Sequence, residues 1–116
     1  MNNHAITTQQ FHMNHVNLIG KMTSEPRIAE LPGGRKVAQF SLSTNESYLD
    51  EDGNVCVRQN WHRMTAWGRW VNVLEELCTK GASLAIEGKL VSRFYRLENG
   101  KRHMISEIEV NDLIIL

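Results

Sequence analysis

Hydrophobic and polar residues alternate along most of this chain, which is the pattern of β-strands with one buried face. In the stretch KVAQFSLSTNES, for example, Ala38, Phe40 and Leu42 share one face, and polar side chains share the other. Alternation of this kind predicts five strands, over about residues 13–22, 36–47, 57–67, 83–97 and 102–116.

Glycine, proline and acidic residues mark the breaks between these strands. Ser24 to Pro26 ends the first strand, and LPGGRK at 31–36 is a strong turn signal before the second. The acidic stretch YLDEDGNVC, residues 48–56, has few apolar anchors and predicts a long exposed hairpin loop. Asn99-Gly100 predicts a tight hairpin between the last two strands.

Only one segment has convincing helical spacing. Between Arg69 and Thr79 the apolar residues recur at intervals of three and four, and Lys80-Gly81 is a helix stop. Five strands with one short helix between strands 3 and 4 is the order of an OB-fold barrel. We therefore predict an all-β domain of this class over residues 13–116, after a flexible N-terminal extension, residues 1–12.

All three tryptophans lie in one segment, NWHRMTAWGRW, residues 60–70. Side chains alternate along a strand, so two sets face opposite ways: Trp61, Arg63, Thr65 and Trp67 on one face, and His62, Met64 and Ala66 on the other. An unpaired buried guanidinium costs on the order of several kcal/mol. The set that contains Arg63 is therefore predicted to point outward, whereas Trp70 joins the helical spacing and is predicted to pack.

Two outward indoles six residues apart predict a stacking surface. Extended backbone separates Trp61 from Trp67 by about 20 Å, at roughly 3.3 Å per residue. The bases of a single nucleic-acid strand fit such a platform, and Arg63 lies between the indoles where it can contact a phosphate or stack on a base. The segment also leaves a second interpretation open, in which a partner subunit or a loop covers the aromatic face.

Net charge does not indicate a nucleic-acid partner. The chain has 13 Lys and Arg and 13 Asp and Glu, so any electrostatic argument must come from their distribution. The acids cluster at 50–52, 75–76 and 106–110. This distribution leaves four arginines close to aromatic residues, namely Arg63, Arg69, Arg93 and Arg96.

Several classes of protein are not indicated. No apolar run approaches the roughly 20 residues of a membrane span, and the N-terminus lacks a secretory signal, so we expect a cytoplasmic location and no membrane partner. Cys56 and Cys78 have no metal-ligand spacing, nor do the histidines, so we expect reduced thiols, no metal and no cofactor. The sequence shows no catalytic triad order and no phosphate-binding loop, so we expect that the protein is not an enzyme.

Five stretches, in order, resemble the bacterial single-stranded DNA-binding proteins. They are VNLIGKMTSEPRI at 16–28, GGRKVAQFSLSTNESY at 33–48, WHRMTAWGR at 61–69, LCTKGASLAIEGKLVSR at 77–93 and EVNDLIIL at 109–116. The resemblance runs from about residue 14 to the last residue. It implies an OB barrel, usually a homotetramer, that coats single-stranded DNA without sequence preference in replication, repair and recombination.

The resemblance also implies particular site residues. The four aromatic positions that stack on bases in the family fall on Tyr48, Trp61, Trp67 and Tyr95. The basic positions expected to contact phosphates fall on Arg63, Arg69, Lys80 and Arg93. His62 matches a histidine at the family's subunit interface, although the pattern agrees equally well with an inward, hydrogen-bonded histidine.

The sequence departs from the family pattern in two respects. His15 and Val91 stand where relatives often have Lys or Arg, so we expect the affinity for DNA to fall less steeply with salt than in a more basic relative. Relatives continue into a flexible linker and an acidic tip that recruits replication and repair enzymes, whereas this chain stops at Leu116. The sequence therefore gives no support for recruitment through such a tip.

Alternative functions remain at this point. One is an OB-type assembly module whose aromatic face is buried against protein, and another is a short primosome-type OB protein, usually dimeric. The sequence does not distinguish four subunits from two. It does not distinguish DNA from RNA either, because stacking is insensitive to the 2′-hydroxyl.

Overall fold

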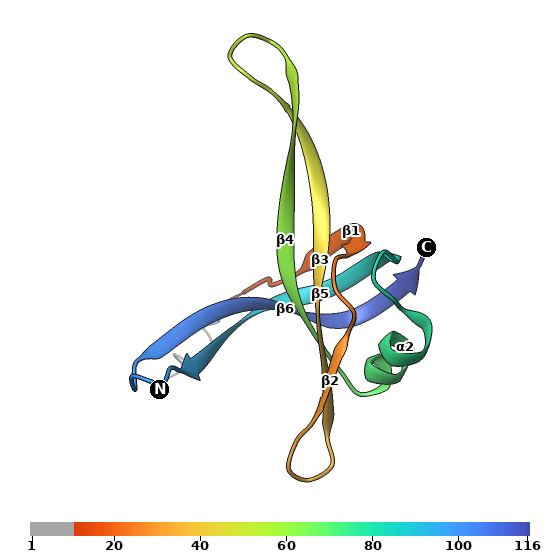
Figure 1. Ribbon diagram of the computed structural model, residues 1–116, viewed down its shortest axis with the longest axis vertical. Helices are drawn as coiled ribbons and strands as arrows, with labels where there is room; N and C mark the ends of the chain where they lie inside the picture. Colours follow the sequence, from red (N-terminus) through yellow and green to blue (C-terminus); the bar gives the residue numbers. More distant parts are fainter. Residues whose placement is uncertain (1–10) are drawn as a thin grey trace, which may run out of the picture.

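Strand pairing in the computed structural model, which describes residues 11–116, closes five strands into a barrel (Figure 1). The strands pair in the order β1-β5-β6-β4-β3, and a further pairing of β1 with β3 closes the ring. The elements are β1 Val16–Met22, β2 Arg27–Glu30, β3 Lys36–Leu49, β4 Val55–Trp67, α2 Arg69–Leu77, β5 Ser83–Arg96 and β6 Arg102–Ile115.

The predicted OB-type barrel and its single helix are confirmed for the described residues, with one addition. Arg27–Glu30 forms β2, which pairs with β3 and was not predicted. Because β2 adds one strand to the count, the helix lies between β4 and β5, and not between strands 3 and 4. Of the predicted N-terminal extension, residues 1–10 lie outside the described part, and Phe11 and His12 have no regular secondary structure.

The interior of the barrel is filled by the inward residues that alternation predicts. Leu42 and Met64 are wholly buried and belong to neighbouring strands, and Leu84 of β5 joins the same core. The barrel closes where β1 meets β3, and this close approach requires Gly20. A Cβ added at Gly20 would collide with the backbone carbonyl of Ser43.

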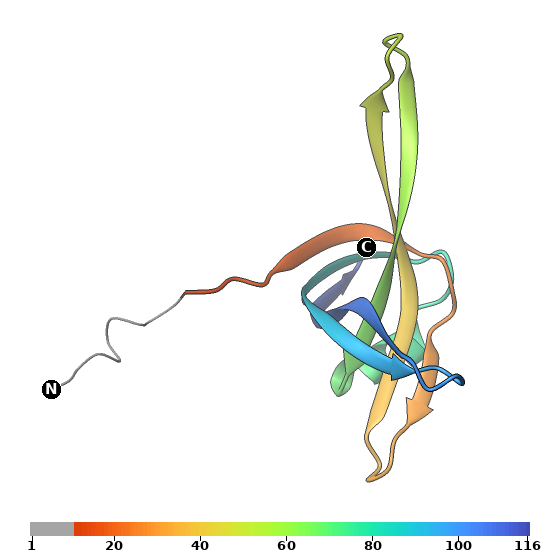
Figure 2. The same ribbon diagram turned by 90° about the vertical axis from the view of Figure 1, so that its left-hand side faces the viewer.

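The β3–β4 hairpin projects well beyond the barrel (Figures 1 and 2). Its strands remain paired out to Leu49 and Val55, so the prediction of a long loop over residues 48–56 is wrong. The connection is short because the Asp50 carboxylate accepts hydrogen bonds from the backbone N–H groups of Asn54 and Asp52, at 2.8 and 2.9 Å. Gly53, with a φ of 82°, supplies the left-handed residue of the turn.

Helix α2 packs on β3, β4 and β6. Gly68 adopts a φ of 62°, which ends β4 and turns the chain into the helix, as predicted. Val71 and Leu74 are buried, and Trp70 is partly buried against the core, so the prediction that Trp70 packs is confirmed. The helix ends at Leu77, two residues earlier than the spacing predicts.

Candidate functional site

Strand β4 presents Trp61 and Arg63 away from the barrel interior. Trp61 pairs with Ser43 of β3 and is 65% exposed, and Arg63 pairs with Ser41 and is also exposed. Met64 and Ala66, from the opposite alternating set, are wholly buried, which confirms the predicted assignment of faces. We call this side of the barrel the outer face; its residues are Trp61, Arg63, Thr65 and Trp67 of β4, Lys89, Arg93 and Tyr95 of β5, and Glu107 and Glu109 of β6.

Trp67, at the end of β4, is half-buried and has a guanidinium over its ring. The Cζ atom of Arg35 lies 4.6 Å from the ring centroid, a cation–π contact that covers one side of the indole. Arg35 was not among the predicted site residues. The sequence offers only the LPGGRK turn as a signal, and that turn gives no indication that its arginine reaches the end of another strand.

Tyr48 lies near the tip of the β3–β4 hairpin and is also paired with an arginine. Arg58 lies 4.6 Å from the ring centroid and forms a 3.2 Å ion pair with Glu46. Tyr48 pairs with Cys56 of β4. Cys56 lies five residues before Trp61 on the same strand, which is an odd number. Because side chains alternate, Tyr48 leaves the β3–β4 ribbon on the side opposite to Trp61.

Tyr95 of β5 is brought close to β4 and β6. Its hydroxyl donates a 2.6 Å hydrogen bond to Glu107 Oε1. This bond, burial and the Glu107 charge together raise the pKa of the Tyr95 phenol, and the nearby charges of Arg93 and Arg63 oppose the rise. Arg63 and Tyr95, which were predicted separately, therefore lie in one electrostatic environment.

Arg93 contacts two carboxylates. Its Nε donates to Glu107 Oε2 at 2.9 Å, and its Nη2 donates to Glu109 Oε2 at 3.1 Å. The prediction that the acids of residues 106–110 lie apart from Arg93 is therefore wrong. The β5–β6 register sets Arg93 opposite Ile105, so carboxylates two and four residues further along β6 lie within reach of its guanidinium.

Glu107 is 1% exposed, although it carries a carboxylate. Thr65 donates a 2.6 Å hydrogen bond to its Oε2, which accounts for the burial of Thr65 on the outer face. Burial alone would raise the pKa of Glu107. The hydrogen bonds from Thr65, Tyr95 and Arg93, together with the charge of Arg93, outweigh burial and hold this pKa below its ordinary value.

The other two predicted basic residues belong to the α2 segment and not to the outer face. Arg69 lies over the ring of Trp70, with its Cζ 4.5 Å from the centroid. Lys80 follows α2 in the turn before β5, and its backbone N–H donates to Glu25 Oε1 at 3.0 Å. Glu25 also lines a surface hollow of about 330 Å³, together with Ser24, Arg27, Gln39, Phe40, Ser41 and Arg63.

His62 is half-buried on the opposite side of β4 from Trp61. Its Nε2 shares a 2.9 Å hydrogen bond with Thr44 Oγ1. Thr44 lines another hollow with Ile19 and Leu116. The structure thus connects His62, through Thr44, to a mixed polar and apolar hollow on the opposite side of β4 from Trp61.

The described residues offer no metal centre. Within residues 11–116, no three His, Cys, Asp or Glu side chains are grouped so that they could hold a metal ion. Cys56 and Cys78 are free thiols. None of the helices among these residues is both long and apolar enough to cross a membrane.

Comparison with known proteins identifies relatives of the whole barrel. The chain is 33% identical over 105 residues to single-stranded DNA-binding protein 1 of Chlorobaculum tepidum, and 29% identical over 104 residues to the single-stranded DNA-binding protein of Neisseria meningitidis. Each match covers 90% of this chain. The chain spans 65% of the length of the first relative and 60% of the second, so it corresponds to part of each.

Solved structures show the same architecture. The Plasmodium falciparum SSB complex with ssDNA superimposes with a TM-score of 0.85 at 32% identity, over 94% of this chain and 99% of that one. A deletion mutant of the single-stranded DNA binding protein from Thermus aquaticus gives a TM-score of 0.79 at 26% identity, over 90% of this chain and 50% of that one. The sequence matches the single-strand binding protein family over residues 13–116, and the chain therefore belongs to that family.

Proposed function

We propose that this chain binds and protects single-stranded DNA, without sequence preference, in replication, repair and recombination. The observation that carries the proposal is the exposed indole of Trp61, with Arg63 two residues further along the same face. The family consists of non-enzymatic binding proteins, and one similar structure contains ssDNA. A cytoplasmic, nucleoid-associated location is part of the proposal, because single strands arise where the chromosome is copied and repaired.

Base stacking is the proposed source of affinity. Each base stacked on an aromatic ring contributes roughly 1–3 kcal/mol, and every base has a π-face, so stacking binds strands of any sequence. We propose Trp61, Trp67, Tyr48 and Tyr95 as the stacking residues. Arg35 and Arg58 each lie over one proposed stacking ring, where a guanidinium can also stack on a base or contact a phosphate.

Phosphate contacts are proposed for Arg63, Arg69, Lys80 and Arg93, with Arg35 and Arg58 added from the structure. These residues do not lie on one surface. Tyr48 and Arg58 belong to the face of the hairpin opposite to Trp61. A strand that contacts both Trp61 and Tyr48 would therefore have to pass around the β3–β4 hairpin, and the bound DNA would follow a curved path.

Titration with oligo(dT) tests the proposal. We expect the tryptophan fluorescence to be quenched as bases stack on Trp61 and Trp67, and the apparent affinity to fall as NaCl is raised, because phosphate contacts release counterions. A matched titration with oligo(U) measures the preference for DNA over RNA. Unchanged fluorescence at micromolar protein and low salt would refute single-strand binding.

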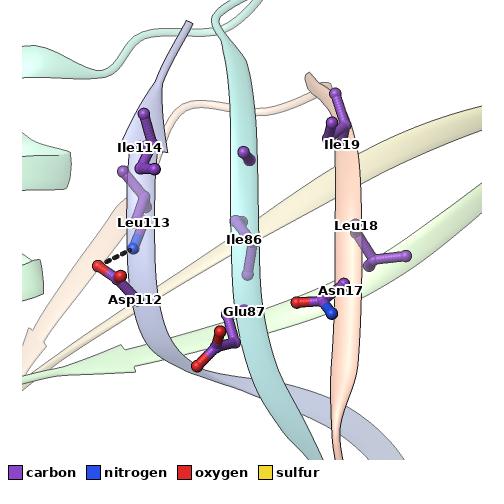
Figure 3. Close-up of a pocket in the computed structure, with 9 residues that line it drawn as sticks. Asn17, Leu18, Ile19, Ile86, Glu87, Asp112, Leu113 and Ile114 are labelled. Atoms are coloured by element: carbon purple, nitrogen blue, oxygen red, sulfur yellow. Dashed lines mark hydrogen bonds between the residues drawn. The ribbon is translucent and has the colours of Figure 1, made fainter.

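We also propose that copies of the chain associate through an apolar surface formed by β1, β5 and β6. Ile19 pairs with Ala85, and Ala85 pairs with Ile114, so the three side chains form a row across adjacent strands (Figure 3). Ile19 is 70% and Ile114 59% exposed, although both are isoleucines. The row borders a hollow of about 550 Å³. Exposed apolar rows of this kind are typical of protein interfaces.

His62 is proposed to lie at the edge of the same interface. The hollow that Thr44 shares with Ile19 continues from this apolar surface, and Thr44 is the hydrogen-bond partner of His62. A homotetramer is the proposed assembly, and a dimer is the alternative. The mass of the native protein separates the two, as four or two copies of a 13.3 kDa chain.

Replacement of Ile19 by aspartate tests the proposed interface. We expect Ile19→Asp to reduce the mass measured by size-exclusion chromatography with light scattering, because association would bury an unpaired carboxylate. Leu77→Asp on α2 is the matched control, because Leu77 is 64% exposed but lies on a different element. A wild-type protein that elutes as a monomer, or an Ile19→Asp variant of unchanged mass, would contradict this interface.

A further inference from the structure

Glu109 is a carboxylate placed among the cations of the outer face. Its Oε2 accepts a 3.1 Å hydrogen bond from Arg93 Nη2, and its Oε1 lies 3.8 Å from Lys89 Nζ. The Glu109 side chain is 25% exposed, and the side chains of Lys89 and Arg93 are more exposed than that. One acidic side chain, accessible to solvent, thus pairs with two cations of β5.

Glu107 holds the same arginine in a different way. It is 1% exposed and bonds to Thr65 and Tyr95 as well as to Arg93 Nε, so its release would leave several polar groups unpaired. The ion pairs of Glu109 are more exposed to water, and exposed ion pairs contribute little to stability. Of the two carboxylates, Glu109 is therefore the one that can exchange for another anion.

We propose that Glu109 acts as an internal competitor for DNA phosphates at Lys89 and Arg93. A phosphate oxygen accepts the same charge-assisted hydrogen bonds as a carboxylate oxygen, so a bound strand replaces Glu109 at these cations. The competition lowers the affinity for single strands, and the displaced carboxylate attracts a cation from solution, so fewer ions are released in total on binding. This inference rests on the proposed function, since it concerns the affinity of that same face.

In the free protein, Arg93 is held by the two carboxylates of β6. With Glu109 in place, two positive and two negative side chains occupy this part of the outer face, and their charges cancel. Without the charge of Glu109, the same place carries a net positive charge. Glu109 is thus an affinity-determining residue, although it is acidic and makes no favourable contact with the strand.

The variant Glu109→Gln tests the proposal, because it keeps the size of the side chain and removes the charge. We expect oligo(dT) to bind about three- to tenfold more tightly at low salt. The plot of log K against log [NaCl] should become steeper, because glutamine, unlike a displaced carboxylate, takes up no cation when the strand binds. Fluorescence anisotropy of labelled oligo(dT), measured at several NaCl concentrations, gives both quantities.

Two further variants separate local competition from net charge. Glu76→Gln removes the same charge from an exposed position on α2, and it should change neither the affinity nor the slope by a comparable amount. In a Lys89→Gln background, the increase in affinity caused by Glu109→Gln should be smaller, because one of the two cations for which Glu109 and phosphate compete is absent.

The possible outcomes are distinct. Equal gains for Glu109→Gln and Glu76→Gln, or an unchanged slope for Glu109→Gln, would overturn the competition while leaving single-strand binding intact. Failure of the wild-type protein to bind oligo(dT) would overturn the proposed function together with this inference. A steeper slope and tighter binding confined to Glu109→Gln would support both.

Discussion

Replacement of Trp61 by alanine is expected to weaken oligo(dT) binding by about 5- to 150-fold, which corresponds to the loss of one base stacked on an indole. Trp61 is 65% exposed and lies outside the buried core, so the variant should fold and associate like the wild type. The measurement is the anisotropy of labelled oligo(dT), because removal of a tryptophan would confound a fluorescence-quenching assay. Light scattering on the same sample checks the oligomer.

The control for this prediction is Leu77→Ala on α2. Leu77 is 64% exposed, so the variant removes a similarly accessible apolar side chain from another part of the surface. It should leave the affinity for oligo(dT) unchanged. If Trp61→Ala dissociates the oligomer without weakening DNA binding by the free subunits, the aromatic face is an assembly surface and the alternative interpretation of the tryptophan segment is correct.

The variant Glu107→Gln is expected to lower the free energy of unfolding by about 1.5–3 kcal/mol at pH 7, because it removes the charge from a buried acceptor of three hydrogen bonds. The pKa of Glu107 lies below its ordinary value of 4.5 in the folded protein. Its contribution to stability is therefore fully present above pH 4.5 and is lost as the pH falls through the lower, folded-state pKa.

Urea unfolding at a series of pH values measures this effect. The difference between wild type and Glu107→Gln should be constant near neutrality and should narrow as the pH falls below about 4.5, because a protonated glutamate resembles glutamine. Glu76→Gln on α2 is the control and should stay within about 0.5 kcal/mol of the wild type. A difference that persists unchanged at low pH would show that the charge of Glu107 does not stabilise the fold.

Most secondary structure could be predicted because it depends on local alternation. The inward positions of Leu42 and Met64 and the helical position of Trp70 follow from side-chain periods of two and of about 3.6 residues. Strand β2 could not be predicted in this way. It is only four residues long, and it is a strand because β3 continues past its pairing with β1 and offers β2 a free edge.

The candidate site was less predictable, because its contacts join strands that are far apart in the sequence. Thr65 meets Glu107 across 42 positions, and the partners of Arg93 depend on the register between β5 and β6. The Asn99-Gly100 turn is a signal for that register, since a tight hairpin sets which residues pair. Counting back from a two-residue turn would nevertheless pair Arg93 with Ser106 and put both carboxylates on the other face, whereas the observed register pairs Arg93 with Ile105.

The sequence by itself determined the barrel class, the outward direction of Trp61 and Arg63, and the family resemblance, because periodicity and motif order are properties of the chain alone. Only the tertiary structure decided that Tyr48 faces away from Trp61, that guanidinium groups cover Trp67 and Tyr48, and that Glu109 pairs with Lys89 and Arg93. These features depend on strand register and twist, which bring together side chains whose separation along the chain carries no signal of contact.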